Sequence, residues 1–253
     1  MNRPKSSKIN HLMKAWPRGT VAVQSWLTKQ GVYRQLADIY RKTAWLERIG
    51  KGAFKISGDK IDWTGGMWAA QQQLKLPVHV GAKTALEMQG YGHFLPLGKG
   101  AQVWLFGTPG VRLPLWFSTY DWSDTLRLVT ADLFRKGQAL GLEQKNMGTY
   151  SITISAPERA ILETLHLVPY QGSFEGAFHL MEGLTSLRHE LIQTLLVQCR
   201  SIKVKRLFMY MAEKCNHPWV SKIDLAKVNL GKGKRRLIKG GKFDPKYQIT
   251  VPR

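Results

Sequence analysis

The sequence predicts an α+β fold, in which a small N-terminal unit of helices and one hairpin precedes a mixed α/β domain with a short sheet and several helices. Apolar residues recur at helical spacing towards both ends of the chain. Short strand-like runs, separated by Gly and Pro, lie between them. A chain of 253 residues is long enough to bury two cores. We therefore expect an N-terminal unit over residues 1–95 and a C-terminal domain over residues 96–253.

Two short amphipathic helices joined by a tight turn are predicted near the N-terminus. Thr20 follows Pro17 and has the hydroxyl side chain typical of an N-cap, so the first of the two helices is expected to begin there. Gly31 lies where a helix end commonly needs a left-handed residue, and the second helix is predicted from Tyr33. An earlier helix, whose apolar stripe begins at Ile9, is expected to pack on both.

The second of these helices has an apolar side and a polar side at 100° per residue. The apolar side is expected to hold Leu36, Ile39, Tyr40 and Thr43. The polar side collects Arg34, Gln35, Asp38, Arg41 and Lys42. These side chains include the groups that reach bases and phosphates in DNA complexes.

A hairpin is predicted directly after this helix. Two strand-like runs, Trp45–Ile49 and Ala53–Ile56, flank Gly50, Lys51 and Gly52. Helix, glycine turn, helix and hairpin in this order indicate a winged helix-turn-helix, with its core over about residues 7–62. In that fold the second helix enters the major groove and the wing lies on the flanking backbone.

This geometry selects the candidate DNA-binding residues of the N-terminal unit. The base-reading candidates are Arg34, Gln35 and Arg41. The phosphate-binding candidates are Lys42, Lys51 and Lys55. Any surface helix shows a charged side to water, which would explain the second helix alone. The ordered set of elements favours DNA binding over that explanation.

The middle of the chain mixes strands with helices. A helix is expected from Thr64 to Leu74, followed by a strand over residues 78–80 and a helix over residues 83–89. The clearest linker is Leu95–Gly100, rich in Pro and Gly, and it sets the expected domain boundary. Further strands are expected over residues 101–106, 113–117, 125–134 and 150–155.

Helices dominate the last part of the chain. Ser155 and Glu158 have the spacing of a capping box, with Pro157 in the first turn of a helix through Leu167. Three more helices are expected over residues 174–184, 187–199 and 203–215. Cys199 and Cys215 fall on the apolar faces of these helices, as buried thiols do.

Basic residues gather at the two ends of the chain. The whole sequence has 38 Lys and Arg against 17 Asp and Glu, a formal net charge of +21. Residues 1–60 hold 13 basic and 3 acidic residues, residues 61–199 hold 10 and 11, and residues 200–253 hold 15 and 3. A charge that served only solubility would be spread evenly, so two surfaces for a polyanion are indicated, and nucleic acid is the simplest one.

The basic residues near the C-terminus are mixed with glycines. Off the apolar stripe of the helix expected over residues 203–215 lie Lys203, Lys205, Arg206 and Lys214. The phosphate-binding candidates of the segment that follows are Lys232, Lys234, Arg235, Arg236 and Lys239. Such side chains on glycine loops suit irregular contacts with a nucleic-acid backbone, although a solvated tail has the same composition.

A membrane location is not predicted. No apolar run approaches the roughly 18 residues that span a bilayer, and the N-terminal stretch lacks the hydrophobic block of a signal peptide. The apolar faces of the expected helices are committed to cores, which argues against a membrane-surface protein. We therefore expect a cytoplasmic protein.

The sequence shows no group of residues spaced for catalysis, so we expect no enzyme activity, no cofactor and no metal site. The histidines are scattered and lack metal-ligand spacing. The alternative is a nuclease-like C-terminal domain. Glu143 and Lys145 have the acid-x-lysine spacing of metal-dependent nucleases, and Asp132 lies upstream.

Four segments of the chain together resemble the AbiEi antitoxins, the regulators of the abortive-infection AbiE type IV toxin–antitoxin systems. The first is residues 8–55, the helix-turn-helix and wing. The others read LPVHVGAKTALEMQGYGHFL, ITISAPERAILETL and GKGKRRLIKGGKFDPKYQITVP. The resemblance covers nearly the whole chain, and it rests on the order and spacing of these segments.

The resemblance implies a two-part protein. Its winged helix would repress the operon promoter through inverted repeats in double-stranded DNA, with room for several copies on the operator. Its C-terminal domain would counter a nucleotidyltransferase toxin without forming a stable complex with it. The DNA-binding role would fall on Arg34, Gln35, Arg41, Lys42 and Lys51. A plain regulator without an antitoxin role remains a further alternative.

Overall fold

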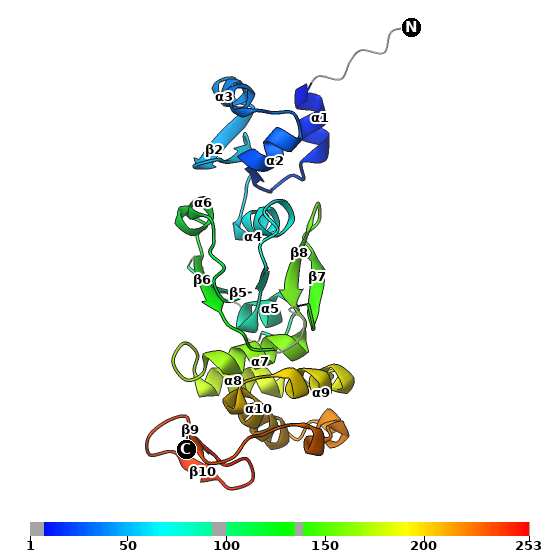
Figure 1. Cartoon of the computed structure of the whole chain (residues 1–253), viewed down its shortest axis with the longest axis vertical. Coiled ribbons are helices and arrows are strands. Elements are labelled where there is room, and N and C mark those ends of the chain that lie inside the picture. Colours follow the sequence, from blue (N-terminus) through cyan, green and yellow to red (C-terminus); the bar gives the residue numbers. More distant parts are fainter. Residues whose placement is uncertain (1–7, 93–99, 135–138, 253) are drawn as a thin grey trace.

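The chain is elongated, and its parts follow one another along the longest axis (Figure 1). The computed structural model describes residues 8–92, 100–134 and 139–252. The helix-turn-helix lies at one end, a mixed sheet with its helices lies in the middle, and a small C-terminal sheet lies at the other end (Figure 1). In the described part of the chain, every helix is too short or too polar to cross a lipid bilayer.

The N-terminal end is a winged helix-turn-helix, as predicted. Its elements are α1 (Lys8–Ala15), β1 (Ala22–Val23), α2 (Gln24–Lys29), α3 (Arg34–Lys42), β2 (Leu46–Gly50) and β3 (Ala53–Ile56). The three strands form an antiparallel sheet in the order β1-β3-β2. Leu12, Trp16 and Leu27 are buried in its core together with Ala37 and Leu46.

The first helix of the helix-turn-helix pair, α2, begins later than predicted. Helix α2 begins at Gln24, not at Thr20, because Ala22 and Val23 pair with the wing as strand β1. The Thr20 hydroxyl donates to the Pro17 carbonyl (2.6 Å) and accepts from the Trp16 indole (3.1 Å), so it is buried inside the unit rather than capping a helix. The left-handed turn at Gly31 is confirmed, with φ of 79°.

The apolar side of α3 is also narrower than predicted. Ala37 is buried and Leu36 and Tyr40 are partly buried, but Ile39 is 53% exposed and Thr43 is exposed. The buried arc of this short helix therefore centres on Ala37 rather than between Leu36 and Ile39. The polar side is exposed as predicted.

The middle of the molecule is a five-stranded mixed sheet. Its elements are α4 (Trp63–Trp68), a π-helical turn (Ala69–Gln73), β4 (Val78–Val80), α5 (Ala82–Met88), β5 (Gln102–Gly107), α6 (Leu115–Thr119), β6 (Thr125–Thr130), β7 (Leu142–Asn146), β8 (Ser151–Ser155) and α7 (Pro157–Leu167). The strand order is β6-β5-β4-β8-β7. Strands β5 and β6 are parallel, as are β4 and β8, and the other two pairings are antiparallel.

The C-terminal part packs helices and a small sheet below α7 (Figure 1). Its elements are α8 (Phe174–Glu182), α9 (His189–Gln198), α10 (Ile202–Lys214), two 3₁₀ turns (Pro218–Lys222 and Leu225–Lys227), β9 (Arg235–Arg236), β10 (Lys242–Asp244) and β11 (Ile249–Val251). The strand order is β10-β11-β9. The buried Ile249 and Val251 join this sheet to the main core.

Three local predictions in the middle of the chain are corrected. The strand expected over residues 113–117 is helix α6, which Pro114 precedes and whose Thr119 hydroxyl bonds the Leu115 carbonyl. Strand β6 ends at Thr130, not at residue 134. Helix α7 does begin after Ala156, but neither Ser155 nor Glu158 caps it, because both side chains bond partners elsewhere.

The expected boundary at residues 95 and 96 falls between α5 and β5. The sheet takes its central strand, β4, from before this boundary and its other four strands from after it. The predicted linker residues 95–99 lie outside the described residues. The division into 1–95 and 96–253 therefore stays a prediction about the chain, and the sheet is built from both sides of it.

The winged helix is fixed to the middle of the molecule by close backbone contacts. The Gln73 side-chain amide donates to the Val21 carbonyl (3.0 Å) and its oxygen accepts from the Val23 amide (2.8 Å), so it pairs with β1 as a strand would. Gly65 packs directly on the Gly19 carbonyl, where a methyl group would overlap it. These contacts set the direction in which α3 points.

Gly65→Ala should destabilise the protein by about 1–3 kcal/mol, because the new methyl group has no space beside the Gly19 backbone. Urea denaturation of the full chain measures this loss. Gly172→Ala is the matched control, since its methyl group would make an ordinary contact 3.6 Å from Leu167 Cβ. A Gly65→Ala protein as stable as the wild type would contradict the close approach of the two segments.

Candidate nucleic-acid interface

Helix α3 lies at one end of the molecule (Figure 1), and its polar side is exposed. All five residues predicted for this surface are exposed: Arg34, Gln35, Asp38, Arg41 and Lys42. Arg41 Nε lies 3.5 Å from the Asp38 carboxylate, which is one helical turn before it. The structure therefore brings together the predicted base-reading residues Arg34, Gln35 and Arg41 on one accessible face.

The wing lies beside α3 and closes a groove. Lys51 is exposed at its tip, where Gly52 has φ of 72° and so permits the tight hairpin. The groove has a volume of about 260 Å³ and is lined by Gln24, Arg34, Asp38, Arg48, Lys51, Gly52 and Phe54. Helix α3 and the wing thus share one concave surface that carries three basic side chains, Arg34, Arg48 and Lys51.

Two residues of this groove, Gln24 and Arg48, were missed in the sequence. Arg48 lies on β2 with the same alternation as the buried Leu46, so its pattern predicts a core position. It is nevertheless exposed, and it lies opposite Phe54 in the groove, next to an irregularity in the pairing of β2 with β3 between Arg48 and Gly50. Gln24 would have been found only from the true start of α2.

Lys55 differs from the other phosphate-binding candidates. Its ammonium group lies 3.1 Å from the Glu47 carboxylate and donates to the Asp59 carbonyl at 3.1 Å. Its side chain is only 17% exposed. Lys55 is therefore engaged within the wing, whereas Lys42 and Lys51 remain on the surface.

The basic residues near the C-terminus form a second surface. All five phosphate-binding candidates predicted for this segment are exposed: Lys232, Lys234, Arg235, Arg236 and Lys239. They lie on and around the small sheet, at the opposite end of the molecule from α3 (Figure 1). The two basic regions of the sequence are therefore two separate surfaces.

Three basic residues of the preceding helix do not belong to this surface. Lys205 and Arg206 are buried, and Lys203 Nζ donates to the carbonyls of His166 (2.8 Å) and Val168. The Arg206 guanidinium donates to four carbonyls, those of Leu230, Gly231, Gly233 and Gln248. Arg206 therefore holds the C-terminal loop and sheet together instead of facing a ligand.

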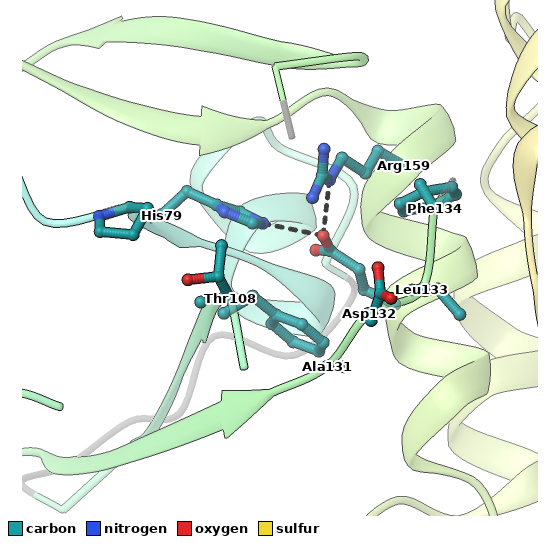
Figure 2. A pocket seen from close by; sticks show the side chains of 11 residues that line it. His79, Thr108, Ala131, Asp132, Leu133, Phe134 and Arg159 are labelled. Atoms are coloured by element: carbon teal, nitrogen blue, oxygen red, sulfur yellow. Dashed lines mark hydrogen bonds and ion pairs between the residues drawn. The ribbon is translucent and has the colours of Figure 1, made fainter. Parts of the chain in front are cut away.

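A buried ionic cluster lies beside the small pocket shown in Figure 2. The Glu163 carboxylate is fully buried and accepts hydrogen bonds from His79 Nε2 (2.8 Å), Arg159 Nε (2.7 Å), the Ser155 hydroxyl (2.8 Å) and the Ala82 amide (3.1 Å). Burial alone raises the pKa of Glu163, but the charges and hydrogen bonds of His79 and Arg159 lower it to about 2. Both oxygens are used, so this carboxylate serves the fold.

The residues of the nuclease alternative are not brought together. Asp132 follows β6 and is ion-paired with Arg200, whereas Glu143 and Lys145 lie on β7 at the other edge of the sheet. Glu143 accepts from Arg188 Nη2 at 2.7 Å. Within the described ranges, no group of three or more His, Cys, Asp or Glu side chains could hold a metal ion.

Comparisons with known proteins agree along the chain. A family model described as "Transcriptional regulator, AbiEi antitoxin, Type IV TA system" matches residues 100–252. A second, described as "Transcriptional regulator, AbiEi antitoxin N-terminal domain", matches residues 5–97. The crystal structure of the RV2827C protein from Mycobacterium tuberculosis is similar, with a TM-score of 0.61 at 17% identity over 95% of this chain and 88% of that chain, which shows the fold alone. No curated protein matches the chain.

Glu163→Gln should lower the free energy of unfolding by about 3–5 kcal/mol, because it removes the negative charge that faces the buried Arg159. Chemical denaturation at pH 7 measures this loss. Glu190→Gln is the control, since that carboxylate is 77% exposed beside His189.

The same pair of proteins tests the pKa of Glu163. Because the folded-state pKa lies below the ordinary value of 4.5, the stability that Glu163 contributes is complete above about pH 4.5 and is lost as pH falls towards 2. The stability difference between the wild type and Glu163→Gln should shrink across that window. A difference that does not change between pH 5 and pH 2.5 would contradict the assignment.

Proposed function

We propose that this chain, which belongs to the AbiEi family of transcriptional regulator antitoxins of type IV toxin–antitoxin systems, represses its own operon. It would do so by docking α3 in the major groove of operator DNA. The observation that carries the proposal is the exposed polar face of α3 beside a basic wing. The family match favours an antitoxin over a plain regulator.

The dimensions of α3 suit this mode of binding. An α-helix with its side chains is about 10–12 Å across, which fits a major groove about 12 Å wide. Arg34, Gln35 and Arg41 would reach base edges, while Lys42 and Lys51 would contact phosphates. Lys55 is left out of the proposed interface, because it is paired with Glu47.

The groove between α3 and the wing adds two candidate contacts. Arg48 and Gln24 line it together with Arg34 and Lys51. Arg48 Nε donates to the Gly50 carbonyl (3.1 Å), which holds the arginine along the wing. Its remaining guanidinium donors are placed to contact the phosphate backbone next to the groove that α3 enters.

The exposed C-terminal basic residues support a second contact with DNA. They lie at the opposite end of the elongated chain from α3, so the two surfaces are well separated (Figure 1). We therefore propose that they contact a different DNA segment. An operator with inverted repeats would hold one copy on each half-site, with the C-terminal surfaces pointing away from it.

The toxin partner and the absence of catalysis belong to the same proposal. The resemblance implies a nucleotidyltransferase toxin that is opposed in the cytoplasm without a stable complex. We also infer that the chain is not an enzyme, since Asp132, Glu143 and Glu163 are each paired with an arginine. Cleavage of plasmid DNA or RNA with Mg²⁺, lost in Glu143→Ala, would reverse this inference.

Replacing Arg34 and Arg41 together by Ala should remove most of the preference for operator over scrambled DNA. Each good base contact contributes about 1–3 kcal/mol of discrimination, so the preference should fall by about tenfold or more. Fluorescence anisotropy with both duplexes measures the ratio. Arg127→Ala, an exposed arginine on β6, is the control and should leave the ratio unchanged. An unchanged ratio in the double variant would reject α3 as the reading helix.

Replacing Lys232, Lys234, Arg236 and Lys239 by Gln tests the second surface without removing folded chain. Binding to DNA should weaken, and the dependence of log K on log salt should become less steep, because fewer counterions are released. The preference for operator over scrambled DNA should persist. A salt dependence equal to that of the wild type would show that this surface does not contact DNA.

A further inference from the structure

Most acidic residues of the winged helix and the segment after it form intramolecular hydrogen bonds or ion pairs. Residues 8–62 contain four carboxylates: Asp38, Glu47, Asp59 and Asp62. Glu47 accepts from Ser57, Gly58 and Lys55. Asp59 binds Arg18 and the Gly19 amide. Asp62 caps α4 through the amides of Thr64 and Gly65.

Asp38 is placed differently from these three. Its side chain is 64% exposed on the polar face of α3, and the contact that the structure gives it is Arg41, at 3.5 Å on the same helix. An exposed ion pair three residues apart stabilises a helix by only about a few tenths of a kcal/mol. Stability of the fold therefore does not explain a carboxylate at this position.

The position is the middle of the surface that would face DNA. At 100° per residue, Asp38 lies about 40° from Arg34 on one side and about 40° from Lys42 on the other. It also lines the groove with Arg48 and Lys51 of the wing. A negative charge sits, in other words, at the centre of a cationic surface.

A carboxylate at the centre of this surface weakens binding to any sequence, because it repels phosphates and cancels part of the cationic charge. It can recover this loss only where the DNA offers a hydrogen-bond donor. In the major groove the exocyclic amine of cytosine is such a donor, and Asp and Glu accept from it. At guanine and thymine the hydrogen-bonding groups in the major groove are acceptors, so binding there would be disfavoured. Adenine also has an amine, but it lies beside the N7 acceptor.

We propose that Asp38 is a specificity-determining residue, which accepts a hydrogen bond from a cytosine amine in the operator and penalises other sequences. The proposal rests on the proposed docking of α3 in the major groove. Asp38 lowers affinity for DNA in general and raises the ratio of operator to other DNA. Arg34, Gln35 and Arg41 increase the affinity for DNA, whereas Asp38 disfavours binding to sequences other than the operator.

The test compares the full-length wild type with Asp38→Asn, which keeps the size of the side chain and removes its charge. Anisotropy is measured on the operator and on a scrambled duplex of equal length, at several salt concentrations. Asp38→Asn should bind the scrambled duplex more tightly, with a steeper salt dependence, and its operator preference should fall by about tenfold. Glu175→Gln, which removes one exposed charge from α8, should change neither quantity.

Changes of single C·G pairs to T·A in the operator locate the contact, since they replace the amine by a carbonyl acceptor. At one position in each half-site the change should lower the DNA affinity of the wild type by about tenfold, and that of Asp38→Asn by less than about threefold. If Asp38→Asn raises the affinity for operator and scrambled DNA by the same factor, the carboxylate only repels phosphates and the proposal is overturned.

Two other outcomes are separable from this one. If Asp38 merely orients Arg41, then Asp38→Asn should weaken operator binding, and the substitution should have no effect in an Arg41→Ala background, which also overturns the proposal. A wild type without operator preference would reject the docking of α3 itself. A wild type with a preference that Asp38→Asn retains in full would reject only the role of Asp38.

Discussion

The pairing of Gln73 with strand β1 is the contact on which the position of the winged helix depends. Strand β1 has only two residues, and one of its edges is covered by β3. On its other edge the Gln73 side chain bonds Val21 and Val23 in place of a neighbouring strand. Gly65 and Gly19 bring the two backbones together beside it. Because α3 packs on the sheet that contains β1, these contacts fix its position relative to the middle of the molecule.

Net charge overstates the cationic surface of this chain, since several basic side chains are internal. Arg206 binds four carbonyls of the C-terminal segment, and Arg159 anchors Glu163 next to His79. Burial of a guanidinium is tolerated only where such acceptors surround it. Arg206 thus converts a glycine-rich stretch, which would otherwise be a solvated tail, into an ordered sheet that carries exposed lysines.

The sequence predicted the elements that local chemistry specifies. Gly31 and the glycines around Lys51 mark turns that few other residues could form, and the polar side of α3 follows from helical spacing alone. It failed where tertiary contacts decide. Ala22 and Val23 have helical spacing with Trp26, but they pair with β3 as a strand. Lys55 has the sequence pattern of a free surface lysine, but in the structure it is ion-paired with Glu47. Arg48 was missed because its alternation with Leu46 predicts a buried position, whereas it is exposed beside an irregularity in the pairing of β2 with β3.

The separation of the two basic surfaces has a consequence for an antitoxin that also regulates transcription. A chain docked through α3 keeps the sheet of β9, β10 and β11 away from that duplex, because the mixed sheet and the helices α7–α10 lie between them (Figure 1). The second surface is then tethered close to the operator, and a tethered site meets nearby DNA at high effective concentration. Two copies on inverted repeats would present two such surfaces, so binding of neighbouring segments would be strengthened without any contact between the copies.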